Sequence, residues 1–378
     1  MIEFRGVTKR FPDGTVAVDD LDLVVDSGRI TVFVGPSGCG KTTSLRMINR
    51  MIEPSGGTIS VEGKDIMSRD AAELRRGIGY VIQQAGLFPH RTILDNVATV
   101  PLLLGWNKKQ ARERAAELMD TVGLAPEMAK RYPAQLSGGQ QQRVGVARAL
   151  AADPPVLLMD EPFSAVDPIV RETLQDELLR LQGELGKTIV FVTHDIDEAI
   201  KLGDKVAVFR TGGKLAQYDE PGVLLSRPAD DFVDSFVGRD RGYRGLGFLS
   251  SDGLPIGDLP VVAVGDRMPT DGWALVVDGE RRPLGWVARG TGTVSEDALV
   301  PGGSLYDAGA GSLRAALDAA LSSPSGRGVA VDGDGRVLGS IGADDVLRGL
   351  ADSREADGAP GADVARPVTD TDATDRVG

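Results

Sequence analysis

The chain has 378 residues, of which 42% are hydrophobic and 26% charged, and its net charge is −13. The length allows about two to three domains, and the negative charge argues against nucleic acid as the main partner, because a phosphate polymer would be repelled. No apolar run approaches the roughly 18 residues of a membrane-spanning helix, and the first residues lack a secretory pattern, so we expect a cytoplasmic protein. The single cysteine excludes a disulfide framework.

An apolar run at residues 30–34 predicts a buried strand, and the phosphate-binding pattern G-x-x-x-x-G-K-[ST] follows it directly. Glycines let backbone N–H groups converge on an anion, and the helix-like stretch after the pattern adds positive potential. Lys41 is expected to reach the β- and γ-phosphates, and Thr42 to bind Mg²⁺ through its hydroxyl. The expected nucleotide-binding residues are Gly35, Pro36, Ser37, Gly38, Cys39, Gly40, Lys41, Thr42 and Thr43. Cys39 is given no catalytic role.

A second anion site is predicted at Leu136-Ser137-Gly138-Gly139-Gln140, where a helix-like stretch begins. Ser137 and the backbone of Gly138 and Gly139 would open that helix and point its positive end at a γ-phosphate.

Four apolar residues then lead into two carboxylates at Val156-Leu157-Leu158-Met159-Asp160-Glu161, which predicts a buried strand with charge at its carboxyl end. Asp160 would hold Mg²⁺ through water, and Glu161 would polarise a water molecule against the γ-phosphate. Taken alone, such a pair is also compatible with a helix cap or a solvated turn.

The order of these motifs, and above all residues 136–140, resembles the ATP-binding-cassette (ABC) family, whose signature sequence is matched completely. The resemblance implies an α/β P-loop NTPase cassette over residues 1–239, with a RecA-like core, an antiparallel β-subdomain and an α-helical subdomain. It also implies a homodimer in which Ser137, Gly138, Gly139 and Gln140 serve the ATP of the other copy. Two Mg-ATP would be sandwiched between two cassettes.

Four further positions take their expected roles from this resemblance. Gln83 would touch Mg²⁺ and the attacking water, with Gln84 as the alternative, and Asp167 in Ser164-Ala165-Val166-Asp167 would communicate with the second copy. His194 would hydrogen-bond the γ-phosphate. Phe11 would stack on adenine, or pack in the small N-terminal sheet. The expected catalytic residues are Glu161, His194 and Gln83, and the expected metal ligands are Thr42, Gln83 and Asp160.

A composition change marks a second module. Residues 240–378 contain 22 Asp and Glu, 13 Arg and no Lys, which is a net charge of −9. Residues 276–287 recur in degraded form at 330–341, an offset of 54 residues, and predict two hairpins around Asp-Gly turns. Helices are expected at residues 228–237, 312–321 and 344–350. The repeat resembles a small α/β pair of cystathionine-β-synthase (CBS) motifs at residues 240–351, regulatory or dimerising, and plain solvated hairpins are the alternative. Residues 352–378 are expected to be a disordered tail.

A cassette followed by such motifs resembles the ATPases of importers for quaternary ammonium osmolytes such as glycine betaine, carnitine, choline or proline betaine. The stretch that adds to this resemblance is Gly79-Tyr80-Val81-Ile82-Gln83-Gln84-Ala85-Gly86-Leu87-Phe88-Pro89-His90. The implied partners are permease subunits and an extracytoplasmic substrate-binding protein, with this chain peripheral at the cytoplasmic face of the membrane. The alternatives are an importer for a sugar or polyamine, and a soluble cassette protein of translation or DNA repair.

Overall fold

The structure is a computed structural model that describes residues 1–82, 86–164 and 166–356. Its backbone contacts divide the chain into two compact units, Met1–Arg239 and Asp240–Gly378. Each unit has its own sheets and its own hydrophobic core.

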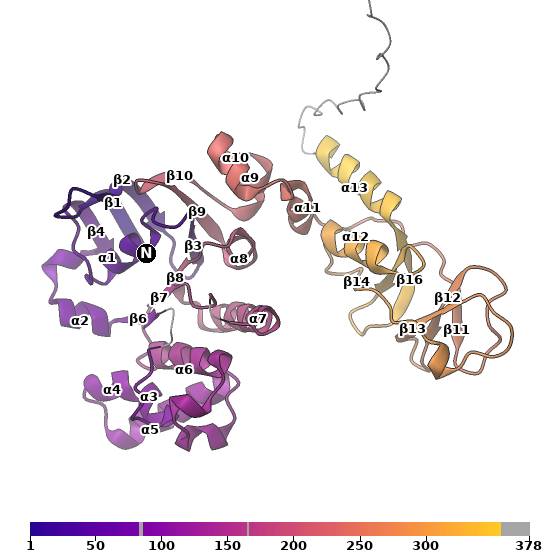
Figure 1. Cartoon of the computed structure of the whole chain (residues 1–378), viewed down its shortest axis with the longest axis horizontal. Helices are drawn as coiled ribbons and strands as arrows, with labels where there is room; N and C mark the ends of the chain where they lie inside the picture. Colours follow the sequence, from indigo (N-terminus) through magenta and orange to yellow (C-terminus); the bar gives the residue numbers. More distant parts are fainter. Residues whose placement is uncertain (83–85, 165, 357–378) are drawn as a thin grey trace, which may run out of the picture. The chain divides into compact units, whose positions relative to one another are not determined.

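A six-stranded sheet forms the centre of the first unit (Figure 1), in the order β10-β9-β3-β8-β7-β6. Its strands are β3 (Ile30–Val34), β6 (Ile78–Val81), β7 (Val156–Asp160), β8 (Thr188–Val192), β9 (Lys205–Arg210) and β10 (Lys214–Asp219). All neighbours are parallel except β10, which is antiparallel to β9. Every residue of β3, β7 and β8 is buried, which explains why these strands are continuous apolar runs in the sequence.

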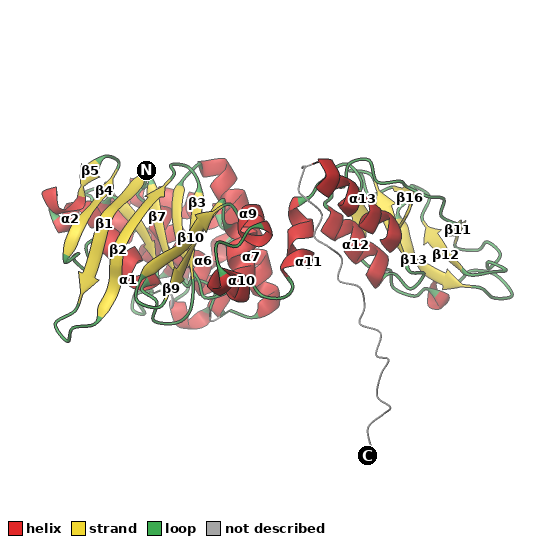
Figure 2. Ribbon diagram, turned by 90° about the horizontal axis from the view of Figure 1, so that it is seen from above, coloured by secondary structure: helices red, strands yellow, loops and turns green. Residues whose placement is uncertain are grey.

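An antiparallel sheet of order β2-β1-β4-β5 lies beside the central sheet (Figure 2). Its strands are β1 (Ile2–Arg10), β2 (Val16–Val25), β4 (Gly56–Val61) and β5 (Lys64–Asp65). The helices found before β6 are α1 (Lys41–Ile48), η1 (Ile66–Ser68) and α2 (Ala71–Arg76). The two sheets share a core in which the Phe33 ring lies 6.4 Å from that of Phe4 and 5.2 Å from that of Phe209.

Short helices between β6 and β7 form the helical subdomain, grouped away from the antiparallel sheet in Figure 1. They are α3 (Ile93–Val97), α4 (Thr99–Leu103), α5 (Lys108–Thr121), η2 (Pro126–Lys130), η3 (Pro133–Gln135) and α6 (Gly138–Leu150). The remaining helices of the unit are α7 (Pro168–Leu185), α8 (Ile196–Leu202), α9 (Pro221–Ser226) and α10 (Asp231–Val237). The predicted helix at residues 228–237 starts later, because Asp230 caps it by accepting from Val233 N. The predicted α/β cassette with three parts is confirmed.

The second unit contains both predicted hairpins, each as part of a three-stranded sheet. The elements are α11 (Arg241–Gly245), η4 (Leu246–Phe248), β11 (Val261–Ala263), β12 (Trp273–Val277), β13 (Pro283–Ala288), η5 (Glu296–Ala298), β14 (Leu305–Asp307), α12 (Leu313–Ser322), β15 (Arg327–Val331), β16 (Val337–Gly342) and α13 (Ala343–Ala356). In both sheets a short strand pairs in parallel with the first hairpin strand, at Val261 with Leu275 and at Leu305 with Val329.

The two hairpin turns are built alike. Asp278 Oδ1 accepts from the backbone N–H of Glu280 and Arg282, and Asp332 Oδ1 accepts from the N–H of Asp334 and Arg336. Arg281 and Gly335, at equivalent places in the two turns, both have a positive φ. The sequence repeat is therefore a structural repeat.

The repeats differ in their helices. Within the described residues, α12 and α13 flank the second hairpin, whereas no α-helix lies between β11 and β14. The expected helix at residues 344–350 extends from Ala343 to Ala356, so the prediction of disorder from residue 352 is wrong for residues 352–356. Val346 is buried and Leu350 half-buried, which anchors the helix, and the Ala, Arg and Glu that follow are good helix formers. The rest of the predicted tail, residues 357–378, lies outside the described residues.

The aromatic cluster predicts a large stability effect. Replacing Phe33 by Ala should lower the free energy of unfolding of the first unit by about 3–5 kcal/mol, because the ring is fully buried. Denaturant unfolding measures this loss. The control Phe88→Ala removes a ring that is 40% exposed and should cost at most about 1 kcal/mol. Equal losses in the two variants would contradict the packing described.

Candidate functional site

The strand order of the central sheet brings the predicted motifs to one edge. Strands β3, β8 and β7 are neighbours and run parallel, so their carboxyl ends meet. The phosphate loop follows β3, Asp160 ends β7, and Thr193 and His194 follow β8. Residues more than a hundred positions apart in the sequence thus form one site.

The phosphate loop depends on two glycines with positive φ. A Cβ on Gly35 would lie 2.3 Å from the Phe209 carbonyl oxygen, and one on Gly40 would lie 2.1 Å from that of Ala17. Because both neighbours are backbone, no other residue fits there without displacing a strand. Lys41 is 5% exposed and donates to the carbonyl oxygens of Gly35 at 2.7 Å and Pro36 at 3.0 Å. Its charge is therefore held inside the loop.

Two expected metal ligands are in direct contact. Thr42 Oγ1, in the first turn of α1, donates to Asp160 Oδ1 at 2.9 Å. Asp160 Oδ2 faces Arg46 Nη2 at 3.2 Å and the Tyr80 hydroxyl at 3.3 Å. Burial, and then the charge of Asp160, raise the pKa of Tyr80, so the phenol stays a hydrogen-bond donor.

The chemistry of this pair suits Mg²⁺, which prefers one or two carboxylate and hydroxyl oxygens together with phosphate and water. No group of three or more His, Cys, Asp or Glu side chains that could hold a metal occurs in the part of the chain that the structure describes. The third expected ligand, Gln83, and its alternative Gln84 lie outside the described residues.

Glu161 and His194 form a pair at the same edge. Glu161 Oε2 lies 3.1 Å from His194 Nδ1, and the side chains are 24% and 58% exposed. Glu161 has φ of 45°, in the left-handed region that a non-glycine residue rarely adopts, and its N–H donates to Val192 O. Such strain is found mainly at functional positions. A carboxylate and an imidazole thus lie together, in reach of water, beside the phosphate loop.

The signature residues form a helix start, as the sequence predicts. Ser137 Oγ accepts from Gln140 N at 3.3 Å, and Gln140 Oε1 accepts from Ser137 N at 3.0 Å, so the two residues make a capping box at the start of α6. Ser137 and Gly138 are exposed. The positive end of a 13-residue helix is therefore open to an anion.

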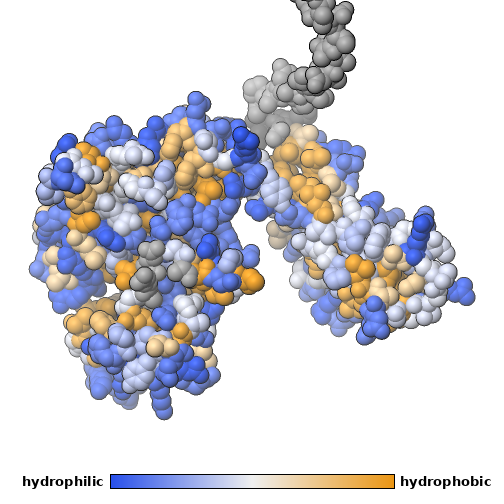
Figure 3. Space-filling view, in the orientation of Figure 1, coloured by the Kyte–Doolittle hydropathy of each residue, from blue (hydrophilic) through white to orange (hydrophobic). Residues whose placement is uncertain are grey.

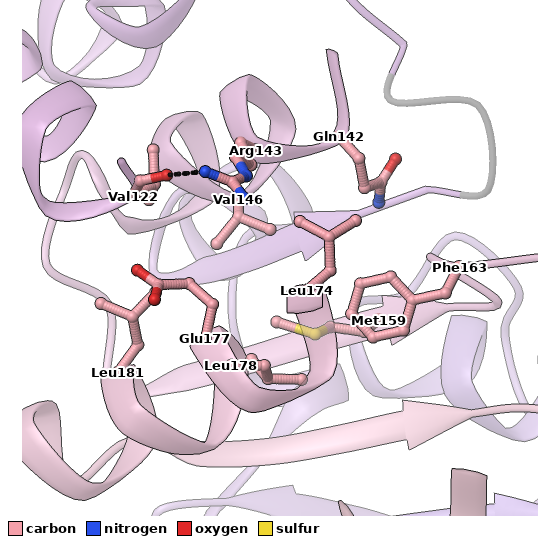
Figure 4. Close-up of a pocket in the computed structure, with 10 residues that line it drawn as sticks. All are labelled: Val122, Gln142, Arg143, Val146, Met159, Phe163, Leu174, Glu177, Leu178 and Leu181. Carbon is pink, nitrogen blue, oxygen red and sulfur yellow. Dashed lines mark hydrogen bonds between the residues drawn. The ribbon is translucent and has the colours of Figure 1, made fainter. Parts of the chain in front are cut away.

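The signature helix borders a small apolar cavity together with the strand that ends at Asp160. Figure 4 shows apolar side chains around a cavity of about 20 Å³, among them Val146 of α6, Met159 of β7, Phe163 of the loop after β7, and Leu174 and Leu178 of α7. Arg143 closes one end by donating to Val122 O at 3.4 Å. Residues of α6, β7 and α7 therefore line one common cavity.

Asp167 acts locally as a helix cap. It is the N-cap of α7 and accepts from Ile169 N at 3.0 Å. Ile169 is 80% exposed, and a Cβ on Gly139 would lie 2.8 Å from Val170 Cγ1, so the first turn of α7 touches the start of the signature helix.

Phe11 lies in the turn between β1 and β2 and is half-buried, outside both cores of the first unit. The alternative of packing in the N-terminal sheet is therefore not supported. Lys9 Nζ lies 5.3 Å from the ring centroid, and an open cavity of about 500 Å³ borders Phe11, Lys9 and Gly56.

Sequence reasoning missed Arg46 and Tyr80, which hold the outer oxygen of Asp160. Arg46 is four residues after Thr42 on α1, a spacing that puts both on one helix face and was available as a signal. Tyr80 stands on β6, next to β7, and this contact depends on the strand order.

Comparison with known proteins identifies the family. The model of the family described as ABC transporter matches residues 18–164. The osmoprotectant import ATP-binding protein OsmV of Salmonella typhimurium is 45% identical over 377 residues, which covers 94% of this chain and 97% of the relative. The chain belongs to the ABC transporter family. It is an ATP-binding ATPase of that family.

Other relatives match the first unit of this ABC ATPase. The carnitine transport ATP-binding protein OpuCA of Listeria monocytogenes is 55% identical over 241 residues, which are 64% of this chain and 60% of the relative. A solved structure described as a dimeric post-hydrolysis state of the ATP-binding cassette MJ0796 bound to ADP and Pi is 35% identical, with a TM-score of 0.53 over 58% of this chain and 99% of that one.

The phosphate loop of the ABC ATPase also predicts an inert thiol. Cys39 is fully buried, and burial raises the pKa of its thiol. Since the thiolate is the reactive form, iodoacetamide should alkylate the native chain at least about tenfold more slowly than the unfolded chain. Mass spectrometry of Cys39 peptides measures both rates. Equal rates would show that the loop is open.

Proposed function

We propose that this ABC ATPase powers import of a quaternary ammonium osmolyte of the glycine betaine, carnitine, choline or proline betaine class. The observation that carries the proposal is the match to an osmoprotectant import ATP-binding protein, because it extends through the second unit as well as the cassette. Relatives described as carnitine and choline transport ATP-binding proteins support the same class of solute.

The proposed ATP site uses the phosphate loop residues 35–43, with Lys41 on the β- and γ-phosphates and the Phe11 ring on adenine. Thr42 and Asp160 would hold Mg²⁺ with Gln83. When bound, Mg²⁺ would neutralise negative charge that develops on the phosphates during hydrolysis.

Glu161 is the proposed general base. Its carboxylate is partly exposed and would accept the proton of a water molecule that attacks the γ-phosphate. His194 accepts or donates at Nδ1 toward Glu161 and leaves its other ring nitrogen for the γ-phosphate. In this proposal Lys41 binds the phosphates, Glu161 takes the proton, and His194 orients the reacting groups.

A second copy of the chain is the proposed partner across the ATP. The exposed Ser137 and the open start of α6 would face the γ-phosphate of the ATP bound to the second copy. The exposed Ile169, near Asp167, would pack against the second copy itself. Solved cassette structures described as dimers, 35% and 36% identical to this chain, support this arrangement.

Permease subunits are the proposed membrane partners, with a substrate-binding protein outside. Figure 3 shows apolar atoms on the surface of the helical subdomain, and exposed apolar residues there include Phe88, Leu102, Leu103, Leu104 and Trp106. None of the described helices is long and apolar enough to cross a membrane. We place the chain at the cytoplasmic face of the membrane, held by these subunits.

For the second unit we propose a CBS-like regulatory role. Its support is the duplicated hairpin with matching Asp turns and the acidic composition of residues 240–378. Salt screens like charges over about 10 Å at 0.1 M, so ionic strength is the signal we propose.

Uptake by the assembled transporter tests the function. Vesicles holding this chain with its permease and binding proteins should take up radiolabelled glycine betaine when ATP is inside. Glu161→Gln should lower ATP turnover and uptake by about 10²–10⁴-fold, because it removes the general base, and should leave ATP binding intact. Hydrolysis without uptake of any quaternary amine would overturn the solute class, and normal turnover in the variant would overturn the role of Glu161.

Removing the second unit tests the regulatory role. A chain that ends at Arg239 should still hydrolyse ATP, whereas the transporter built with it should lose the salt dependence of uptake. The control is a chain that ends at Ala356, which keeps every described element of the second unit. Unchanged salt dependence in the short chain would contradict electrostatic sensing.

A further inference from the structure

A buried carboxylate lies behind the Glu161–His194 pair and has no part in the mechanism above. Glu198, on α8, is 6% exposed. Its Oε2 accepts from Thr193 Oγ1 at 2.6 Å, and its Oε1 accepts from Gln175 Nε2 at 3.1 Å. Glu198, Glu161 and His194 line the same cavity of about 30 Å³. A carboxylate buried this deeply needs a reason to be there.

Helix capping does not supply that reason. Asp195 is the N-cap of α8 and Glu198 the third helical residue, the position from which an acid normally accepts the N-cap N–H. Here Asp195 N donates to Thr193 Oγ1 at 3.0 Å instead, and the Asp195 carboxylate accepts from Asp197 N. Both oxygens of Glu198 are therefore directed at side chains of other segments.

Those two side chains join the His194 segment to α7. Thr193 directly precedes His194, and its hydroxyl is fixed on one side by Glu198 and on the other by Asp195 N. Gln175 lies on α7, one turn after Arg171, whose Nη1 is 3.8 Å from Asp195 Oδ2. Arg171 Nη2 also donates to Val166 O at 3.3 Å, in the loop before α7. The segment around Thr193 is thus linked to α7 twice, once through the buried Glu198 and once through the ion pair of Arg171 with Asp195.

The burial of Glu198 makes this link depend on both hydrogen-bond donors. Burial raises the pKa of its carboxyl group, and the hydrogen bonds from Thr193 and Gln175 oppose that rise. The two donors satisfy both oxygens of this buried carboxyl group, and loss of either donor leaves a buried oxygen unsatisfied. Both hydrogen bonds of Glu198 therefore persist only while the segment around Thr193 and α7 stay in their present positions.

We propose that Glu198 is a positioning residue for ATP hydrolysis: it clamps the segment around Thr193 against α7 and so holds His194 beside Glu161. Arg171, one turn before Gln175 on α7, connects the same segment to the loop before α7 through Asp195 and Val166 O. This inference rests on the proposed role of His194, and the experiment separates the two.

Steady-state ATPase kinetics of the full-length chain test the clamp. Glu198→Gln keeps the shape but replaces one acceptor oxygen by an N–H₂ group, so on that side the hydrogen bond can form only with its direction reversed, which disturbs the present link. We expect kcat to fall about 5–10-fold with KM within about twofold of wild type, the pattern of lost transition-state positioning. Glu172→Gln, which removes one charge from the exposed face of α7, is the matched control and should keep wild-type kcat.

A double-mutant cycle distinguishes positioning from general damage. In a His194→Ala background, Glu198→Gln should lower kcat by less than about twofold further, because its effect passes through His194. An equal loss in both backgrounds, or wild-type kcat in Glu198→Gln alone, overturns the clamp. If His194→Ala alone keeps wild-type kcat, the proposed role of His194 fails and the clamp fails with it. If only His194→Ala is impaired, the clamp alone fails.

If thermal unfolding shows that Glu198→Gln does not fold, a second pair of variants tests the clamp instead. Thr193→Ser keeps the hydroxyl and should stay within about twofold of wild-type kcat, whereas Thr193→Val removes it and should lose about as much as predicted for Glu198→Gln. Equal kcat values for these two variants overturn the proposal.

Discussion

The hydrogen bond between Thr42 and Asp160 joins the two halves of the nucleotide site. One partner stands in the first turn of the helix after β3, and the other at the end of β7, with β8 between these strands. Their meeting requires that the three strands be parallel and in this order. It also requires that the phosphate loop pass close against neighbouring backbone, which the glycines at 35 and 40 permit. The same constraint sets Glu161 and His194 beside each other, since each closely follows the end of one of these strands.

Packing around this site connects the signature helix, α7 and the segment that carries His194. The signature helix and β7 line one small apolar cavity, and the first turn of α7 touches the start of that helix at Gly139. The clamp at Glu198 ties α7 to the His194 segment. A change at the γ-phosphate would therefore reach both surfaces that we propose to meet a second copy of the chain, the signature and the loop before α7. These contacts give a physical route for coupling between two ATP sites, although each contact alone contributes only modestly.

Much of the cassette could be predicted from the sequence, because its buried parallel strands are continuous apolar runs and its phosphate loop needs glycine and lysine at fixed spacing. The strands at Ile30–Val34 and Val156–Asp160 match the prediction closely. Contacts between distant segments could not be predicted this way: Tyr80 reaches Asp160 only because β6 is next to β7, and Glu198 looks locally like an ordinary helix-start acid. The end of α13 was missed for a different reason. Beyond residue 350 the good helix formers Ala, Arg and Glu continue the helix to residue 356, whereas composition alone suggests disorder from residue 352.

The central claim is that ATP closes two copies of this chain around two shared sites. Light scattering on the full-length Glu161→Gln variant, with and without Mg-ATP, tests it most directly, since slow hydrolysis should trap the closed form. The account predicts a mass that doubles from one chain to two when Mg-ATP is added, and no change when Ser137 is also replaced by Arg. An unchanged mass with ATP bound, or doubling that survives the Ser137 substitution, would contradict it.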